Sequence, residues 1–419
     1  MSNRRNSFYL LILFALLAWL VSGRTFLLHL AYVGFGVLVG AFVWSWMSIN
    51  WVSIARYTQT RRAQVGQPLI EHFSVHNTGL VPKLWLAVLD HSSLPHHNAS
   101  HVVPTLLPRR RYQWQASTVC TRRGVFTLGP MTVLSGDPFG LFQFPRRIEA
   151  TAEVIVYPLT VPIHRFATPI GPLTGGRAIR RRAHFITTNA AGVREYQPGD
   201  SFNRIHWRST ARRRRLMVKE FELDPLGDVW IFLDLSQAAL VERPGAADFR
   251  GLPPQLPPST AEYGIVAAAS LAQYFVDKGR ALGFVTYGPQ REIVQPDRGP
   301  RQLLRVLEIL AVARSESEQA LQHMLALEAH LLGRGTTAII ITASQDPAWA
   351  AEAYALARRG VRLIAVLIDP LSFGAPPANH TDFRAMVEAA GALVYTIRQD
   401  DDLTAALSYT PSARRRAIG

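Results

Sequence analysis

The chain has 419 residues, of which 48% are hydrophobic, and a formal net charge of +15 at pH 7. This length suffices for about two or three domains with sizeable cores, and the single cysteine, Cys120, excludes an intramolecular disulfide. The charge is uneven, because the segment from Arg177 to Lys219 holds 12 basic residues against the acids Glu195 and Asp200. The basic character therefore belongs mainly to one segment.

Two apolar runs open the chain, over residues 7–23 and 25–49. A membrane-spanning helix needs about 17–25 residues, so we predict a transmembrane helical hairpin over residues 1–55. Basic residues flank both outer ends, and only Arg24 lies between the runs. The positive-inside rule then predicts a cell-membrane protein with both termini and the soluble domains in the cytoplasm. If the first run were instead a cleaved signal peptide, the second would act as a stop-transfer helix and the location would be the same.

The middle region, residues 56–160, changes to short alternating runs that are typical of strands, at residues 69–77, 84–91, 112–121, 124–135 and 152–158. We expect a small antiparallel β-sandwich with Trp85 and Trp114 in its core. One loop clusters acidic and imidazole side chains, which favours either a zinc or copper site or a solvated loop; these are Asp90, His91, His96, His97 and His101.

Residues 226–405 alternate strand and helix patterns and predict an α/β domain, followed by a basic tail at 406–419. The strand-like runs are 228–236, 280–288, 336–344, 361–370 and 392–398, and a long helical run covers 301–332. Five strands joined by helical crossovers predict a parallel sheet with helices on both faces.

Ligand sites in such sheets form beyond the carboxyl ends of the strands. Oxygen-bearing side chains gather there, and Asp234, Ser236 and Asp346 are the candidate ligands for a hard cation such as Mg²⁺. The alternative is that Asp346 only caps the helix that begins near Pro347.

The segment between the two domains, residues 161–225, is a basic linker. Gly199 permits a tight turn, Asp200 is expected to cap a helix over the following residues, and the sequence from Leu216 then alternates as a strand. Two arginine runs are candidates for binding acidic headgroups, whereas no known nucleic-acid-binding motif is present. They are Arg180, Arg181, Arg182, Arg212, Arg213, Arg214 and Arg215.

The patterns REYQPGD, RIHW and LMVKEFE in this linker, with RRGVFTLGPMTVLSGDPFGLFQ upstream, resemble the domain-of-unknown-function-58 family. The resemblance covers nearly the whole chain and implies a membrane-anchored protein whose last domain is like von Willebrand factor A. The hallmark positions, which we expect to serve the domain junction and partner interaction, are Arg194, Glu195, Tyr196, Gly199, Asp200, Arg204, Trp207 and Arg208.

The resemblance also implies partners, namely a MoxR-type AAA+ ATPase and a transglutaminase-like membrane protein. In von Willebrand A domains a metal-ion-dependent adhesion site uses an Asp-x-Ser-x-Ser motif, and here Ala238 stands in place of the second serine after Asp234 and Ser236. Mg²⁺ at this degenerate site is the only cofactor that the resemblance implies.

Three functions follow. The chain contains no HExxH, P-loop, G-x-S-x-G or C-x-x-C motif, which favours a non-enzymatic, membrane-tethered adaptor. The alternatives are anionic-lipid or nucleic-acid binding through residues 177–219, and a metal-dependent hydrolase that uses Asp234 and Asp346.

Overall fold

The computed structural model describes residues 2–167, 190–197, 202, 205–221, 227–242, 256–376 and 383–408. The chain groups into two compact units, the first made mainly of residues 1–159 and the second of most of residues 160–419.

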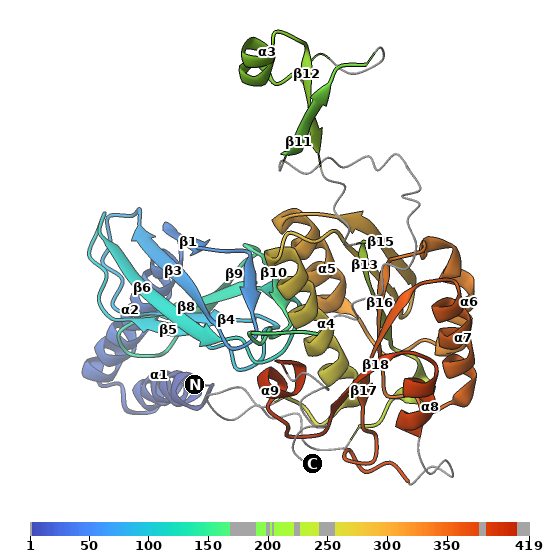
Figure 1. The fold of residues 1–419 in the computed structure, drawn as a ribbon. Coiled ribbons are helices and arrows are strands. Elements are labelled where there is room, and N and C mark those ends of the chain that lie inside the picture. The colour runs from blue at the N-terminus through green and yellow to red at the C-terminus, as the bar shows by residue number, and fades with distance from the viewer. Residues whose placement is uncertain are drawn as a thin grey trace. The chain divides into compact units, whose positions relative to one another are not determined.

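The first unit begins with two helices, α1 (Ser2–Ser22) and α2 (Thr25–Ile49), which pack against each other (Figure 1). Both contain stretches long and apolar enough to cross a membrane, with mean hydropathies of 1.6 and 2.1. The prediction of two apolar N-terminal helices is confirmed. Most of their surface is exposed apolar side chain, as expected for helices that face lipid.

The rest of the first unit is β-rich. Its three sheets have the strand orders β1-β3-β6, β2-β10-β7 and β5-β4-β8-β9. The strands are β1 (Val52–Thr58), β2 (Arg62–Gln64), β3 (Pro68–Asn77), β4 (Leu86–Asp90), β5 (His101–Val103), β6 (Arg111–Val119), β7 (Gly124–Leu128), β8 (Met131–Gly136), β9 (Gln143–Ile148) and β10 (Ala152–Tyr157). Pairing is antiparallel as predicted, except that β2 and β10 run parallel.

Two apolar clusters fill this β-rich region. The larger joins the inner faces of β1, β3, β4 and β8 around Phe73, Leu86 and Met131. Trp114 packs against this cluster and stacks on Phe73, with ring centroids 5.0 Å apart. The core position predicted for Trp114 is therefore confirmed.

The second unit is built on a six-stranded sheet with the order β15-β14-β13-β16-β17-β18. Its strands are β13 (Val229–Asp234), β14 (Leu282–Tyr287), β15 (Arg291–Asp297), β16 (Thr337–Thr342), β17 (Arg362–Ile368) and β18 (Leu393–Ile397). The five predicted strands are all present and parallel. The sheet is nevertheless mixed, because β15 pairs antiparallel with β14 at one edge.

Helices cover both faces of this sheet (Figure 1). One face packs on α4 (Thr260–Asp277), where Gly264 approaches Leu233 and Ile341. Trp230 and Phe232 point to the other face, against α6 (Leu321–Glu328), α7 (Pro347–Arg358) and α8 (Phe383–Ala389). The expected single long helix is wrong: it is divided into α5 (Pro300–Val312) and α6 by the polar residues 313–320. A last short helix, α9 (Leu403–Ser408), packs on β18.

Candidate functional site

The hallmark segment forms a small module of two antiparallel strands and a helix. Strand β11 (Ala190–Glu195) pairs with β12 (Met217–Phe221), and α3 (Trp207–Arg213) lies between them in the chain. Ile205, Met217 and Val218 are its buried apolar residues, at 4%, 2% and 2% exposure. Ile205 forms a bridge with Val218 and the His206 amide donates to the Met217 carbonyl, so the residues just before α3 pair with β12.

The start of α3 differs from the prediction. The helix begins at Trp207, and the side chain of His206 caps it by accepting a hydrogen bond from the Ser209 backbone at 3.2 Å. An imidazole nitrogen thus has the capping role at the first turn of the helix that was expected for the Asp200 carboxylate. The helix was therefore predicted too long, and Asp200 itself lies outside the described residues.

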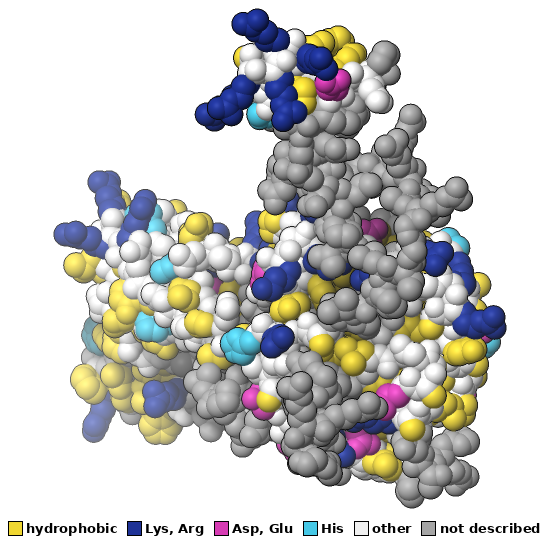
Figure 2. Space-filling model, viewed as in Figure 1, with side chains coloured by type: hydrophobic (Ala, Val, Ile, Leu, Met, Phe, Trp, Pro, Cys, Tyr) yellow, Lys and Arg dark blue, Asp and Glu magenta, His cyan; other side chains and the backbone are white. Residues whose placement is uncertain are grey.

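The module presents cationic and hydrophobic side chains on its surface (Figure 2). Arg208 and the run Arg212–Arg215 are exposed, and Arg215 pairs with Glu195 at 2.9 Å on the surface. Trp207 and Phe202 are both 68% exposed. Trp207 is therefore not part of the module's own core, so a packing role for it between domains stays a prediction.

The remaining predicted residues of this segment divide into two groups. Tyr196 has its ring centroid 5.8 Å from that of Phe202, and the backbone of Arg194 is paired in β11. Outside the described residues lie Arg180, Arg181, Arg182, Gly199, Asp200 and Arg204.

Two predicted metal ligands, Asp234 and Asp346, each accept hydrogen bonds from groups of the second unit. Asp234 ends β13 and is only 9% exposed; its Oδ1 accepts a hydrogen bond from the Ser236 backbone at 3.0 Å, and its Oδ2 accepts one from the Thr342 hydroxyl at 2.6 Å. Burial raises the pKa of the Asp234 carboxyl, against the opposing effect of these hydrogen bonds. Asp346 caps α7 by accepting from the Ala348 backbone at 2.9 Å. Over the part of the chain described, no group of three or more His, Cys, Asp or Glu side chains could hold a metal ion.

Sequence reasoning missed a buried ionic cluster between β1, β3 and β4. The Arg56 guanidinium donates to Glu71 at 2.7 and 3.0 Å and to Asp90 at 3.0 Å. His97 Nε2 lies 3.1 Å from a carboxylate oxygen of Glu71 and of Asp90. All four side chains are at most 3% exposed. The cluster is electrically balanced when His97 is protonated.

The carboxylates hold that proton on His97. Burial alone would lower the pKa of His97, but the hydrogen bonds and charges of Asp90 and Glu71 outweigh it and raise the pKa to about 9. For the carboxyl groups of Glu71 and Asp90, burial alone would raise the pKa values. The contacts with His97 and Arg56 outweigh this effect and hold both pKa values below their ordinary values. Of the loop histidines, His97 therefore belongs to a structural ion network with Arg56, Glu71 and Asp90.

A second missed feature joins α2 to the β-rich region. Lys83 is completely buried, and its ammonium donates to the backbone carbonyls of Met47 and Asn50, at the carboxyl end of α2. It also lies 5.9 Å from the ring centroid of Trp51. Burial lowers the pKa of Lys83 to about 8. A cation at this position satisfies the last carbonyls of the helix and complements its dipole.

The loop between β8 and β9, residues 137–142, forms the other attachment. Asp137 is buried, and its carboxylate accepts hydrogen bonds from the backbone amides of Phe139, Leu141 and Phe142, at 2.8, 3.2 and 2.6 Å. Ser45 of α2 donates to the Phe142 carbonyl at 2.9 Å. The sequence GDPFGLF thus forms a tight loop that is hydrogen-bonded to α2.

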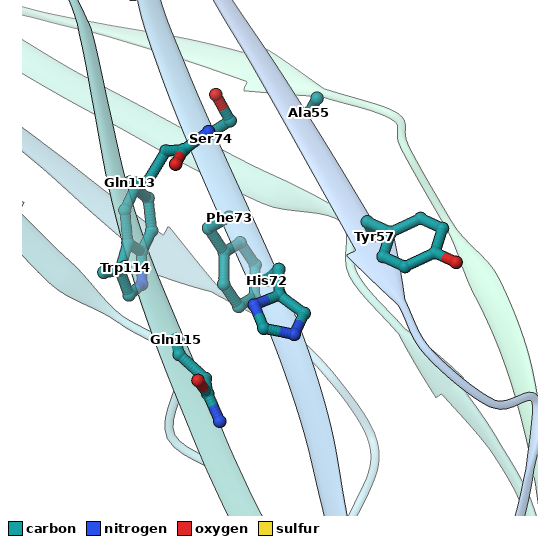
Figure 3. Close-up of a pocket in the computed structure, with 8 residues that line it drawn as sticks. All are labelled: Ala55, Tyr57, His72, Phe73, Ser74, Gln113, Trp114 and Gln115. Carbon is teal, nitrogen blue, oxygen red and sulfur yellow. The ribbon is translucent and has the colours of Figure 1, made fainter.

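A shallow depression of about 540 Å³ lies on the outer face of the β1-β3-β6 sheet (Figure 3). Tyr57, His72 and Gln115 occupy one cross-strand row, and Ala55, Ser74 and Gln113 occupy the next. The depression is open, and its polar side chains converge on no single point.

Comparison with known proteins bears on the second unit above all. Residues 192–378 match the family model described as "Protein of unknown function DUF58". The DUF58 region includes the α3 module and most of the six-stranded sheet, so the resemblance seen in the hallmark residues is supported there.

One curated relative is the uncharacterized protein YeaD of Bacillus subtilis (strain 168), 24% identical over 201 residues. The alignment covers 46% of this chain and 44% of that protein, so the chain spans less than half the length of this relative.

Solved structures resemble only a quarter of the chain. They include the CARDB domain of a Pyrococcus furiosus protein, with 14% identity, 25% of this chain and 91% of that chain covered, and a TM-score of 0.20. A red sea bream transglutaminase has 16% identity, with 25% of this chain and 15% of that chain covered, and a TM-score of 0.18. At such low TM-scores these likenesses carry no argument about function.

Proposed function

We propose that this chain is a membrane-tethered, non-enzymatic interaction protein whose soluble domains lie in the cytoplasm. The observation that carries the proposal is the attachment of α2 to the β-rich region. Lys83 binds the last carbonyls of α2, and Ser45 donates to the loop at residues 137–142. An apolar hairpin fixed in this way to a folded domain is suited to hold that domain at a membrane surface.

The proposed partner is a protein, and the resemblance points to a MoxR-type AAA+ ATPase, with a transglutaminase-like membrane protein as a further component. We assign the second unit a von Willebrand factor A-like role in binding this partner. The exposed Trp207, Phe202 and arginines of the α3 module supply aromatic and cationic side chains of the kind that protein interfaces favour.

The test is affinity capture of tagged full-length protein from native membranes in mild detergent, with bound proteins identified by mass spectrometry. The variant Arg212–Arg215→Ala is compared with a variant that replaces four exposed arginines elsewhere, Arg109, Arg110, Arg358 and Arg359. We expect an AAA+ ATPase with the wild type and with the matched variant, and less of it with Arg212–Arg215→Ala. Wild-type capture without any ATPase would overturn the assigned partner.

The variant Asp234→Ala separates an active adhesion-type site from a degenerate one in the same experiment. Both carboxylate oxygens of Asp234 accept hydrogen bonds within the domain. We therefore expect partner recovery from Asp234→Ala to be independent of added Mg²⁺ or chelator. Loss of the ATPase in this variant, together with a Mg²⁺ requirement in the wild type, would show a working metal site. The same engagement of Asp234 leaves a metal-dependent hydrolase with the least support.

A second candidate function is binding of anionic lipid by the α3 module. It is favoured by the exposure of Arg208 and Arg212–Arg215 on one small module. Each arginine contributes about 1 kcal/mol near an anionic surface, so four substitutions should weaken binding to phosphatidylserine vesicles by on the order of 10²–10³-fold. Binding of the soluble part that does not weaken with salt would contradict this function.

A further inference from the structure

The loop at residues 137–142 lies beside the hairpin of α1 and α2. Leu141 packs in one apolar cluster with Leu38 and Ala41 of α2, and the partly buried Phe8 and Ile12 of α1 pack against that cluster. Phe42 makes edge-on ring contacts with Phe142 and Phe144, with centroids 5.6 Å apart in both pairs. The loop therefore contacts the hairpin along its side, in addition to the end of α2.

The depth of this contact follows from the pairing of the two helices. A Cβ atom on Gly34 would lie 2.8 Å from Ile12, so these two positions are level, that is, at the same height along the axis of the hairpin. Since the helices are joined by a tight turn and run in opposite directions, Arg4 is level with Phe42, and Leu38 lies about 6 Å nearer the turn. The helix from Arg4 to Ser22 has 19 residues and is about 28 Å long, close to the thickness of a hydrocarbon core.

Two arginines at the start of α1 lie beside the loop, which places the loop at the outer end of the hairpin. The guanidinium carbon of Arg5 lies 6.0 Å from the Phe142 ring centroid, and Arg4 Nη1 would lie 3.9 Å from a Cβ atom on Gly140. Charged side chains at the outer end of a membrane helix sit at the headgroups. Residues 140–142 therefore lie at the boundary between headgroups and acyl chains.

The chemistry of the loop suits that boundary. Phe139 is 62% exposed and Pro138 is exposed beside it. Asp137, the acidic residue of the loop, is 2% exposed and its carboxylate is occupied by backbone amides, so it presents no anion to the surface. An exposed aromatic ring on a loop that lies beside two arginines is a combination that binds an interface of anionic headgroups.

We propose that residues 137–142 form a membrane-interface loop that inserts Phe139 into the headgroup region of an anionic bilayer. This inference rests on the membrane anchor of the proposed function and adds a third contact with the membrane, made by the β-rich region itself. The loop holds that region against the bilayer at a fixed depth.

The test is site-directed spin labelling of the full-length protein in bilayers that contain phosphatidylglycerol. Cys120 is completely buried and is first replaced by Ala, and single cysteines are then introduced by Phe139→Cys, Phe14→Cys and Tyr57→Cys. Phe14 is 72% exposed in the middle of α1, and Tyr57 is 66% exposed on β1. Accessibility of each label to oxygen, which enters lipid, is compared with its accessibility to a polar nickel complex.

We expect the ratio of oxygen to nickel accessibility at position 139 to be several-fold higher than at position 57 and lower than at position 14. Equal ratios at 139 and 57, with position 14 in lipid, would overturn the loop insertion alone. Equal ratios at 14 and 57 would overturn the membrane anchor and the loop insertion together. A label at 139 that is shielded from both reagents would indicate a protein partner on Phe139 and would also overturn the proposal.

Discussion

Asp137 shows how one side chain can shape a loop and fix it to a helix. Three backbone amides donate to its buried carboxylate. Because a buried amide without an acceptor costs about 1–3 kcal/mol, we expect Asp137→Ala to lower the free energy of unfolding by at least about 2 kcal/mol. Denaturant unfolding of the full chain in detergent measures this. The control is Asp277→Ala at the exposed end of α4, and equal stabilities of the two variants would refute the prediction.

His97 predicts a pH dependence of stability. Its pKa rises from 6.5 to about 9 on folding, so protonation favours the folded state. This contribution is fully present below pH 6.5 and is lost as the pH rises through 9. Folding lowers the pKa values of Glu71 and Asp90, so both carboxylates stabilise the fold at pH values above their ordinary pKa values. This contribution is lost as the pH falls.

The measurement is the difference in unfolding free energy between wild type and His97→Gln at several pH values. This difference should shrink from pH 6.5 to pH 9. Taking the difference removes the opposite trend from Lys83, whose lowered pKa makes stability rise with pH above 8. His91→Gln, at an exposed loop position, should show no such change. A pH-independent difference for His97→Gln would mean that the histidine is not charged in the fold.

At the residue scale, the sequence indicated which side chains carry chemistry better than it indicated which groups they contact. The loop histidines and Asp90 were recognised as a cluster, yet their partners Arg56 and Glu71 lie on β1 and β3, and only the strand register brings them to His97. The same is true of Lys83 and the carbonyls of α2. Asp234 was placed at the carboxyl edge, but its hydrogen bond with Thr342 depends on side-chain direction at the ends of neighbouring strands.

The α1–α2 hairpin gives a prediction at the scale of elements. Gly34 packs directly on Ile12, whereas nothing lies within 4 Å of a Cβ atom on Gly36. Gly34→Val should force the helices apart, because close approach of membrane helices depends on small residues. A disulfide between cysteines at positions 15 and 31, where two buried alanines lie level on the paired helices, should then form more slowly than with Gly34 intact, whereas Gly36→Val should leave its rate unchanged. Equal rates in both variants would show that the helices do not pack at Gly34.

Periodicity identified the strands with a clear alternating or apolar pattern and missed others of similar length, such as β1 and β15. Every predicted strand of both units is present, because each is a clear alternating or apolar run. Strand β15 escaped notice since it contains Pro296 and three charged residues, which an edge strand tolerates. The run 124–135 was taken as continuous, but Gly129 has a positive φ of 85° and a side chain there would collide with the Ala150 carbonyl, so the chain turns and β7 and β8 join different sheets.

At the scale of the molecule, the β-rich region should depend on its membrane helices. A fragment that begins at Val52 lacks the carbonyls that Lys83 binds and the serine that holds residues 137–142. We expect faster hydrogen exchange in β8, β9 and the residues around Lys83 in this fragment than in the full chain in nanodiscs. Strand β17 in the core of the second unit should exchange equally in both. Unchanged exchange in β8 and β9 would show that the helices add no stability.

The hydrogen bonds from Lys83 to the end of α2 have a consequence for how the protein meets a partner in the membrane. Helix α2 ends at Ile49 and strand β1 starts at Val52, so in the membrane-anchored protein that we propose no flexible linker separates the bilayer from the first folded domain. Such a domain diffuses in two dimensions and turns about essentially one axis, the membrane normal. Much of the translational and rotational entropy of association is then lost before a partner in the same membrane arrives. Weak contacts made by the β-rich region would therefore suffice for assembly at the bilayer, although the same contacts would be too weak between molecules free in solution.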